Sequence, residues 1–189
     1  MSIERILWEQ DACGLAELVQ KGELAPAELV DAAIARAEKT QPEINAIAVK
    51  TYERARDRAK NVDRTLPLAG VPTAIKDLGI AQKGVTTHGG SRAPTFTPDF
   101  DSVLVERWNA AGLIPIATST SPEQGLRLMT ESVAFGITRN PWNTGHTSGG
   151  SSGGAPALGA AGGRAGPPAS GGGGPRRPPP ARLRPGGRA

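Results

Sequence analysis

Cysteine, histidine and long apolar runs are scarce in this chain of 189 residues. Its one cysteine, Cys13, excludes a disulfide framework within the chain, and we expect it to be a small buried side chain. No stretch reaches the ~18 consecutive apolar residues of a membrane span. The N-terminus carries acidic residues and lacks the apolar run of a secretion signal. We therefore expect a cytoplasmic protein that does not bind a membrane.

The only histidines are His88 and His146, and neither has a second potential ligand at metal-site spacing. No cysteine cluster exists either, so we predict no metal site. The glycine patterns of phosphate-binding loops and the GxSxG nucleophile turn are also missing. The sequence thus predicts neither a metal nor an organic cofactor.

Acidic residues and lysine are missing from residues 164–189, which consist almost wholly of Gly, Pro, Arg and Ala. Six arginines give this tail a charge of +6, while the whole chain is +4, so residues 1–163 carry −2. The basic balance therefore does not indicate a nucleic-acid-binding face on the folded part. We expect one domain over 1–163 and a disordered tail over 164–189, because the tail has too little apolar surface to offset chain entropy.

Helical periodicity alternates with short apolar runs in the first 163 residues, which predicts an α/β fold. We expect helices over 11–21, from Pro26 to a stop at Pro42, over 52–60 and over 102–111, and strands over 44–49, 71–75 and 113–118. Pro115 favours an edge position for the last strand. In the helix at 102–111, we expect Val103, Leu104, Arg107 and Trp108 to cover the sheet.

Lys76 stands at the end of the predicted strand 71–75 and precedes Asp77. Burial lowers the pKa of a lysine, so Lys76 is a candidate base near neutral pH. The alternative is an ordinary lysine at a strand end, paired with a carboxylate. The stretch "GGSSGG" (149–154) is equally ambiguous: its glycines permit close backbone approach to a ligand, but such a hexamer also serves as a flexible linker.

Four motifs in order are more specific than either feature: "GVPTAIKD" (70–77), "TTHGGSRA" (86–93), "ESVAFGITRNPWN" (131–143) and "SGGSSGG" (148–154). This series resembles the amidase signature family, serine hydrolases that cleave amides. Within it, the chain is most similar to the 6-aminohexanoate cyclic dimer hydrolase-like branch. The resemblance implies the N-terminal portion of the amidase signature fold, a mixed β-sheet core covered by helices.

The resemblance implies a Ser–cis-Ser–Lys triad in which Lys76 is the base and Ser151 the bridging serine. It places Gly125, Arg127, Gly149 and Gly150 at the substrate. The implied substrate is a small-molecule amide, cleaved through an acyl-serine intermediate. The resemblance implies no cofactor and no nucleic-acid partner, and it is compatible with a homodimer in the full-length form.

The chain departs from the family where the nucleophile is expected, about two dozen residues after the bridging serine. Pro175 stands there, and proline has neither a hydroxyl nor an N–H. The codons of Gly, Pro and Ala, and most codons of Arg, begin with two G or C bases, so we hypothesise a frameshift near 155–166. A milder departure puts Thr118 and Thr120 where the family usually has a basic residue and an asparagine, which changes the pocket loop at about 119–129.

Three functional hypotheses follow. The first is an amidase by family whose present chain is truncated and inactive because it lacks the nucleophile; a glutamyl-tRNA(Gln) amidotransferase A-type subunit is an alternative with the same motifs. The second is a working enzyme with Ser170 as a relocated nucleophile. The third is a non-catalytic pseudo-amidase whose basic tail binds RNA or another acidic partner.

Overall fold

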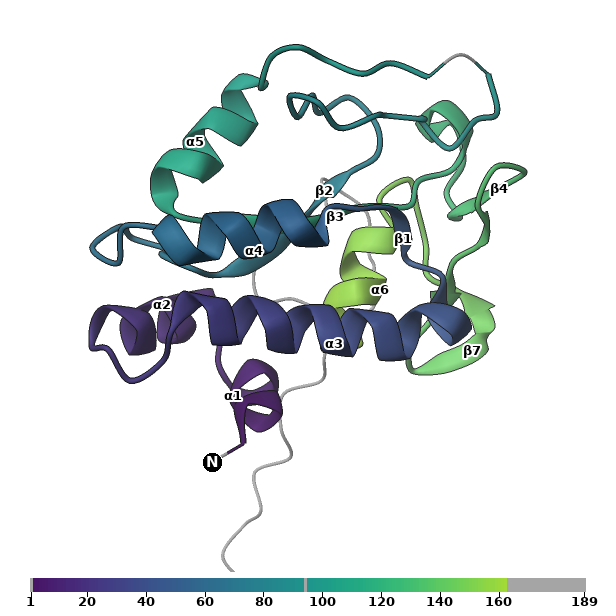
Figure 1. The fold of residues 1–189 in the computed structure, drawn as a ribbon. Helices are drawn as coiled ribbons and strands as arrows, with labels where there is room; N and C mark the ends of the chain where they lie inside the picture. The colour runs from purple at the N-terminus through teal and green to yellow at the C-terminus, as the bar shows by residue number, and fades with distance from the viewer. Residues whose placement is uncertain (1, 94, 163–189) are drawn as a thin grey trace, which may run out of the picture.

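The computed structural model describes residues 2–93 and 95–162 (Figure 1). The tail from 164 onward, with Ser170 and Pro175, lies outside the described residues, so the division into a domain and a tail stays a prediction. The described helices and strands, in chain order, are α1 (Ile3–Glu9), α2 (Ala12–Gln20), α3 (Pro26–Ile44), β1 (Ile47–Lys50), α4 (Tyr52–Asn61), β2 (Pro72–Lys76), α5 (Val103–Ala111), β3 (Ile114–Ser119), the 3-10 turn η1 (Glu123–Gly125), β4 (Glu131–Ser132), β5 (Gly136–Ile137), β6 (Arg139–Asn140), β7 (Asn143–Thr147) and α6 (Gly154–Ala160).

A three-stranded sheet in the order β1-β3-β2 forms the centre of the fold. Strand β2 runs parallel to β3, and β1 runs antiparallel to it. Strand β3 is buried along its whole length, as expected for a strand with neighbours on both sides. This mixed sheet with its covering helices confirms the predicted α/β class.

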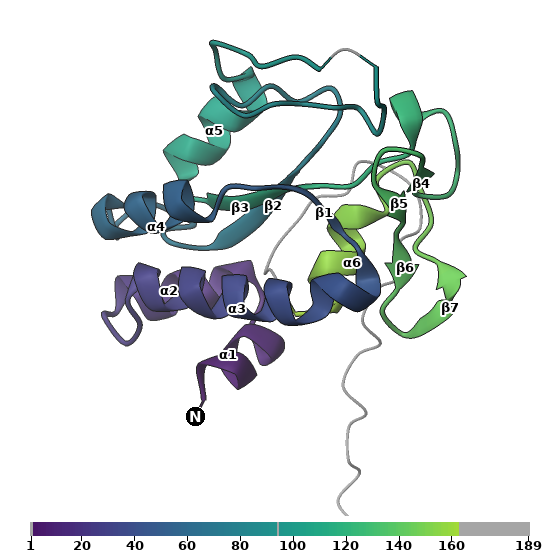
Figure 2. The ribbon, with the colours of Figure 1, turned by 45° about the vertical axis from the view of Figure 1, so that its right-hand side comes forward.

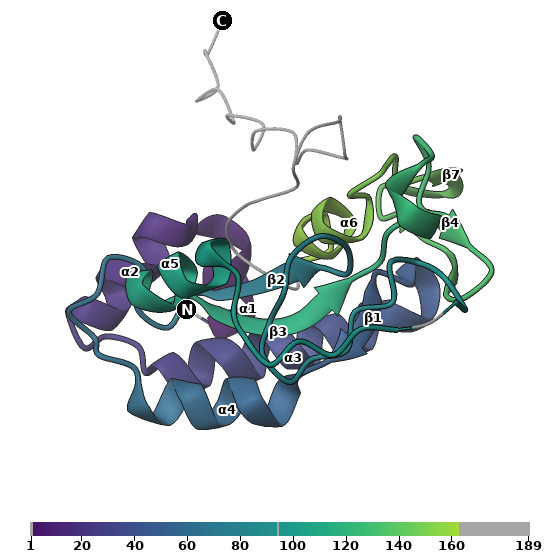
Figure 3. The ribbon, with the colours of Figure 1, turned by 90° about the horizontal axis from the view of Figure 1, so that it is seen from above.

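Helices pack on the sheet from several directions. In Figure 1 the long helix α3 lies below the sheet, with α1 beneath it. Seen from above, α4 and α6 lie on opposite sides of the strands (Figure 3), and both contact β3. The short hairpins β4–β5 and β6–β7 lie together at one end, beside α6 (Figure 2). Their position brings the segment 126–147 next to the start of α6.

Helix α3 begins as the sequence predicts but ends later. Pro26 occupies its first turn, where no N–H is needed, and Glu28 accepts the free backbone N–H of Ala25 at 2.8 Å. The predicted stop at Pro42 is wrong, because the helix continues to Ile44. The side chain of Gln41 explains the extension. Its Oε1 accepts hydrogen bonds from the backbone N–H groups of Ala46 and Ile47, both at 3.0 Å, so these groups just beyond the helix have a partner.

Strand β3 is central, so the prediction of an edge strand from Pro115 is also wrong. The β2–β3 ladder is irregular between Thr73 and Ala74: Thr73 pairs with Pro115, and Ala74 pairs with Ala117. Pro115, which has no N–H to donate, therefore lies next to an irregularity in the β2–β3 ladder. A bulge of this kind is the place where a sheet tolerates proline away from its edge.

Two predicted burial patterns also differ from the structure. Helix α5 packs through Val105, which is fully buried, and Trp108 is partly buried against the core, but Val103, Leu104 and Arg107 are exposed. Cys13 is exposed on α2, not buried. In α2 the buried side chains are Leu15, Ala16 and Val19, so Cys13 lies outside the buried stripe.

No helix in 2–93 or 95–162 is long and apolar enough to cross a membrane.

Leu29 provides a test of the core beneath the sheet. Its side chain is fully buried in α3, so we expect Leu29→Ala to lower the free energy of unfolding by about 2–5 kcal/mol through lost burial and the cavity left behind. Leu128 is 85% exposed, and Leu128→Ala should change it by no more than about 0.5 kcal/mol. Urea denaturation of both variants measures the difference, and equal costs would contradict this packing.

Candidate active site

Lys76 is the last residue of β2, where the buried strand becomes partly exposed. The four preceding residues, Pro72 to Ile75, are buried, and Lys76 is half-buried. Parallel pairing with β3 holds the strand end in place, with Lys76 in register with Ser119. The sequence-based expectation that a buried strand delivers Lys76 to its end is confirmed.

The segment 148–154 is folded tightly against its neighbours and does not act as a linker. Thr130 holds it at two points: its hydroxyl donates to the carbonyl of Gly149 at 2.8 Å and accepts the N–H of Gly153 at 2.9 Å. A Cβ on Gly150 would lie 2.9 Å from backbone atoms of Leu128 and Met129. Only glycine allows so close an approach at this position.

Lys76 and Ser151 meet although 75 positions separate them in the chain. The ammonium or amine Nζ of Lys76 donates to Ser151 Oγ at 2.9 Å. Burial lowers the pKa of Lys76, and within the described part of the chain no carboxylate forms an ion pair with it. The Gly150–Ser151 peptide bond is cis. The ordinary alternative, a strand-end lysine paired with a carboxylate, does not describe this site.

The other predicted site residues surround this pair to different degrees. Gly125 has φ +70°, and a Cβ built there would lie 3.8 Å from Ser151 Oγ, so Gly125 faces the serine. Gly149 and Gly150 lead directly into Ser151. The side chain of Arg127 is exposed, and only its carbonyl lies close to the loop, 3.0 Å from a Cβ built on Gly150. The structure thus brings Gly125, Gly149 and Gly150 to Ser151, and leaves Arg127 at the surface beside them.

Thr118 and Thr120, the two unusual residues of the pocket loop, are buried and hydrogen-bonded. Thr118 Oγ1 accepts the N–H of Val49 at 3.1 Å, and the hydroxyls of Thr120 and Thr138 lie 2.7 Å apart. A Cβ on Gly154 would lie 2.4 Å from Thr120 Oγ1. Thr118 therefore joins β1 to β3, and Thr120 contacts Thr138 and the start of α6, so both hydroxyls are engaged within the protein.

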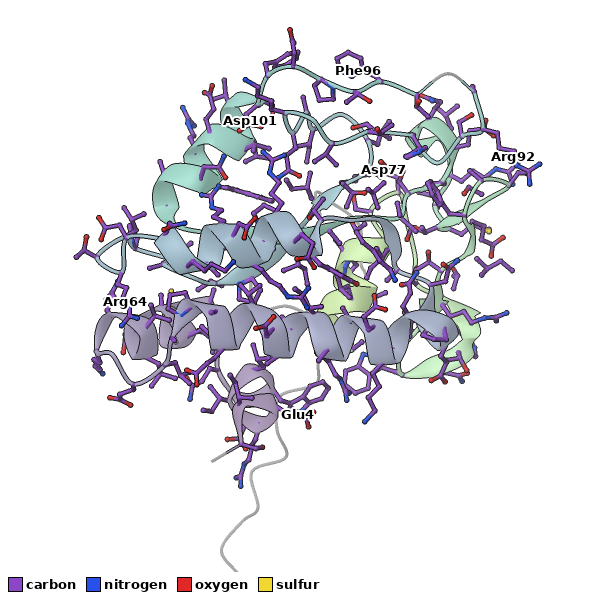
Figure 4. All side chains as sticks on the ribbon, in the orientation of Figure 1. Glu4, Arg64, Asp77, Arg92, Phe96 and Asp101 are labelled. Atoms are coloured by element: carbon purple, nitrogen blue, oxygen red, sulfur yellow. The ribbon has the colours of Figure 1, made fainter. Side chains whose placement is uncertain are left out.

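A buried carboxyl lies immediately behind Lys76. Asp77 is fully buried, and its Oδ1 accepts the backbone N–H of His88 at 3.1 Å, with His88 Nδ1 at 3.7 Å. Figure 4 shows Asp77 inside the molecule, whereas Arg92 and Phe96 lie on the outer loop. Burial raises the pKa of Asp77, and the N–H of His88 opposes the rise.

Asp77 and Thr130 are the structural supports that the sequence did not single out. Asp77 connects the end of β2 to the turn at 88–90, and the carbonyl of Gly89 accepts the N–H of Gln124 at 2.8 Å. The 122–125 segment that carries Gly125 is thereby attached to the strand that carries Lys76. Thr130 gives no signal in the sequence, because its role depends on which distant backbone it meets.

No group of three or more His, Cys, Asp or Glu side chains within 2–93 and 95–162 is arranged to hold a metal ion. His88 contacts Asp77 and the ring of Phe135, and His146 is exposed on β7. The chemistry that Lys76 and Ser151 offer is proton transfer between a partly buried amine and a hydroxyl.

Comparison with known proteins places this geometry in a family. The amidase family model matches residues 28–181, most of the chain, so the chain belongs to the amidase family. Over 158 residues it is 40% identical to the 6-aminohexanoate-cyclic-dimer hydrolase of Paenarthrobacter ureafaciens, covering 82% of this chain and 31% of that protein. Over 152 residues it is 41% identical to the A-type subunit of glutamyl-tRNA(Gln) amidotransferase from Synechococcus sp. (strain CC9605), covering 76% of this chain and 30% of that one.

Solved structures agree with the sequence comparison. The structure of 6-aminohexanoate cyclic dimer hydrolase superposes with a TM-score of 0.78 at 40% identity, over 84% of this chain and 33% of that chain. A bacterial aryl acylamidase of the amidase signature family superposes with a TM-score of 0.74 at 31% identity, over 82% and 34%. The predicted family and fold are confirmed. The chain spans about a third of the length of these relatives.

Asp77 predicts a pH-dependent difference in stability. The pKa of Asp77 in the folded state lies above the unfolded value of about 3.9. The contribution of its protonated carboxyl to the free energy of unfolding is therefore complete below about pH 4, and it is lost as the pH rises through the folded pKa. Asp77→Asn removes this titration. We therefore expect the stability of the variant, relative to the parent, to rise between pH 4 and pH 7.

Urea midpoints of the parent and of Asp77→Asn at both pH values measure this change. Asp99→Asn supplies a matched control, because it makes the same chemical change at an exposed position. A constant difference between the parent and Asp77→Asn would show that Asp77 does not titrate in this way.

Proposed function

We propose that this chain carries the proton-relay part of an amidase site. The hydrogen bond from Lys76 Nζ to Ser151 Oγ is the observation that carries the proposal. A neutral Lys76 takes a proton from Ser151, which takes one from a nucleophilic serine as that serine attacks an amide carbon. The acyl-serine is then released by water. The reaction is hydrolysis of a C–N bond other than a peptide bond.

The substrate we propose is a small-molecule amide. The 40% identity to a 6-aminohexanoate-cyclic-dimer hydrolase supports an amide of that kind as the first to test. Leu126 and Leu128, on the segment that follows Gly125, are more than 80% exposed, which fits contact with methylene groups. Gly125, Gly149 and Gly150 keep backbone close to Ser151, where the reacting carbonyl would lie.

We propose that the present chain does not complete this reaction, because Pro175 stands where the nucleophilic serine is expected. Lys76 and Ser151 alone then provide the base and the bridge without the group that they activate.

A chimera tests the amidase proposal. Residues 1–162 of this chain, joined to the remaining part of the 6-aminohexanoate-cyclic-dimer hydrolase, should hydrolyse the cyclic dimer. Lys76→Ala in the chimera should lower kcat by about 10²–10⁴-fold, the usual contribution of a positioned base. Lys60→Ala on α4, where the side chain is 66% exposed, is the matched control and should leave kcat unchanged. A folded chimera that is equally active with and without Lys76 would refute the proposed role.

The origin of the tail is tested at the DNA level. If a frameshift produced residues 164–189, then the coding DNA from codon 150 onward contains a second reading frame that encodes a Gly-Gly-Ser motif about two dozen codons after Ser151. Resequencing an independent template across this region, and past codon 189, reveals it. An intact single frame with no such motif would remove the frameshift hypothesis.

A second candidate function is amide transfer, as in a glutamyl-tRNA(Gln) amidotransferase A-type subunit. The 41% identity over 152 residues to a protein of that kind favours it as strongly as the first relative favours hydrolysis of a cyclic amide. The proton relay would be the same, and the amide donor would be glutamine. Residues 1–162 joined in turn to the remaining part of each relative distinguish the two. Release of ammonia from glutamine by the amidotransferase chimera alone would favour amide transfer, and cleavage of the cyclic dimer by the hydrolase chimera alone would favour hydrolysis.

A further inference from the structure

Ser151 has the surroundings of a nucleophile as well as those of a bridge. Its hydroxyl is only partly buried, and within the described part of the chain Lys76 is the one side chain that hydrogen-bonds it. In a triad, the bridging hydroxyl would also contact the nucleophilic serine. Here the residue expected at that place is Pro175, which has no hydroxyl to offer.

We propose that Lys76 and Ser151 form a Ser–Lys dyad in which Ser151 is itself acylated by activated esters. Ser–Lys pairs act as nucleophile and base in hydrolases of other folds, so two residues suffice for this step. The activity goes beyond the proposed amide hydrolysis and does not depend on it, since it needs neither the missing nucleophile nor the rest of the relatives' length. Its substrates are esters with a good leaving group, such as aryl esters of short acids.

Lys76, Ser151 and the ester supply every proton and leaving group that this step needs. Ser151 Oγ bonds to the ester carbonyl carbon while the neutral Nζ of Lys76, 2.9 Å away, accepts the hydroxyl proton. The bond from carbon to the aryl oxygen then breaks, and the phenolate leaves. Burial favours the neutral amine that this step requires. An amide is a poorer substrate, because its amine must be protonated before it leaves.

The loop also offers groups that accommodate the reacting carbonyl. Among the described residues, no hydrogen bond occupies the backbone N–H of Gly150 or of Ser151. Backbone N–H groups beside a nucleophile stabilise the oxyanion that forms on attack. On the facing side, a Cβ on Gly125 would lie 2.7 Å from Leu78 Cδ2 and 3.8 Å from Ser151 Oγ, so glycine keeps residue 125 from adding a side chain between Leu78 and the serine.

Labelling of the full 189-residue chain with p-nitrophenyl acetate tests the dyad. We expect release of p-nitrophenolate in a burst, and an acetyl group on Ser151 by peptide mass spectrometry. The labelling rate should rise with pH as Lys76 loses its proton, with an apparent pKa below the usual lysine value of about 10.4. Lys76→Ala should lower the rate by about 10²-fold or more and remove that pH dependence.

Two variants separate chemistry from folding. Ser151→Cys keeps the size of the side chain and should still be acetylated at position 151, now as a thioester. Ser132→Ala, on β4, is a matched control that should be labelled like the parent. Circular dichroism and the urea midpoint of each variant show whether it is folded, so a loss of labelling in a folded Lys76→Ala chain is attributable to the base.

Several results would overturn the dyad. An acetyl group on Lys76 would show that the amine is the nucleophile, and one on Ser170 would support a relocated nucleophile in the tail. No adduct on a folded chain would show that Ser151 is not activated. None of these results bears on the chimera that tests amide hydrolysis, where a separate serine supplies the nucleophile, so the two proposals fail independently.

Discussion

The hydrogen bond between Lys76 and Ser151 is the interaction on which the described structure converges. It joins the end of β2 to the loop before α6, and each of its two ends is held by separate parts of the fold. Strand β3 fixes β2 through parallel pairing, while α6 packs on β2 and β3. A distance of 2.9 Å between two side chains needs both supports to be rigid.

The need for close approach explains the glycines and the buried hydroxyls around the pair. The loop 149–154 lies against two other backbones, one at 128–129 and one at Thr120, with no room for a Cβ at Gly150 or Gly154. Backbone groups so close together must be hydrogen-bonded, and Thr130 satisfies two of them. Glycine therefore provides the space, and threonine provides the bonds that glycine cannot make.

The sequence predicts the local structure well where a single periodicity decides it. The apolar positions of α3, such as Leu29 and Val30, are buried as expected, and Gly112 ends α5 with φ +89°. The errors at Pro42 and Pro115 arise because other contacts outweigh a local rule: the side chain of Gln41 extends a helix, and a bulge admits proline to a central strand. The role of Asp77 was not predicted although its partner His88 lies in the motif 86–93, because the motif does not show which backbone N–H the carboxyl accepts. The role of Thr130 could not be predicted, because its partners Gly149 and Gly153 lie about twenty positions away and no pattern connects them to it.

The pairing of Lys76 with Ser151 is expected from family resemblance alone, because 75 positions separate the two residues and no periodicity connects them. Their meeting in the structure does not by itself assign a direction to the proton. In a triad the proton passes through Ser151 from a third hydroxyl, whereas in a dyad it starts on Ser151. The same hydrogen bond serves both, so what decides between them is whether a hydroxyl stands on the far side of Ser151. Because the sequence has a proline at 175, where the family resemblance puts the nucleophilic serine, we propose that Lys76 activates the hydroxyl of Ser151 directly.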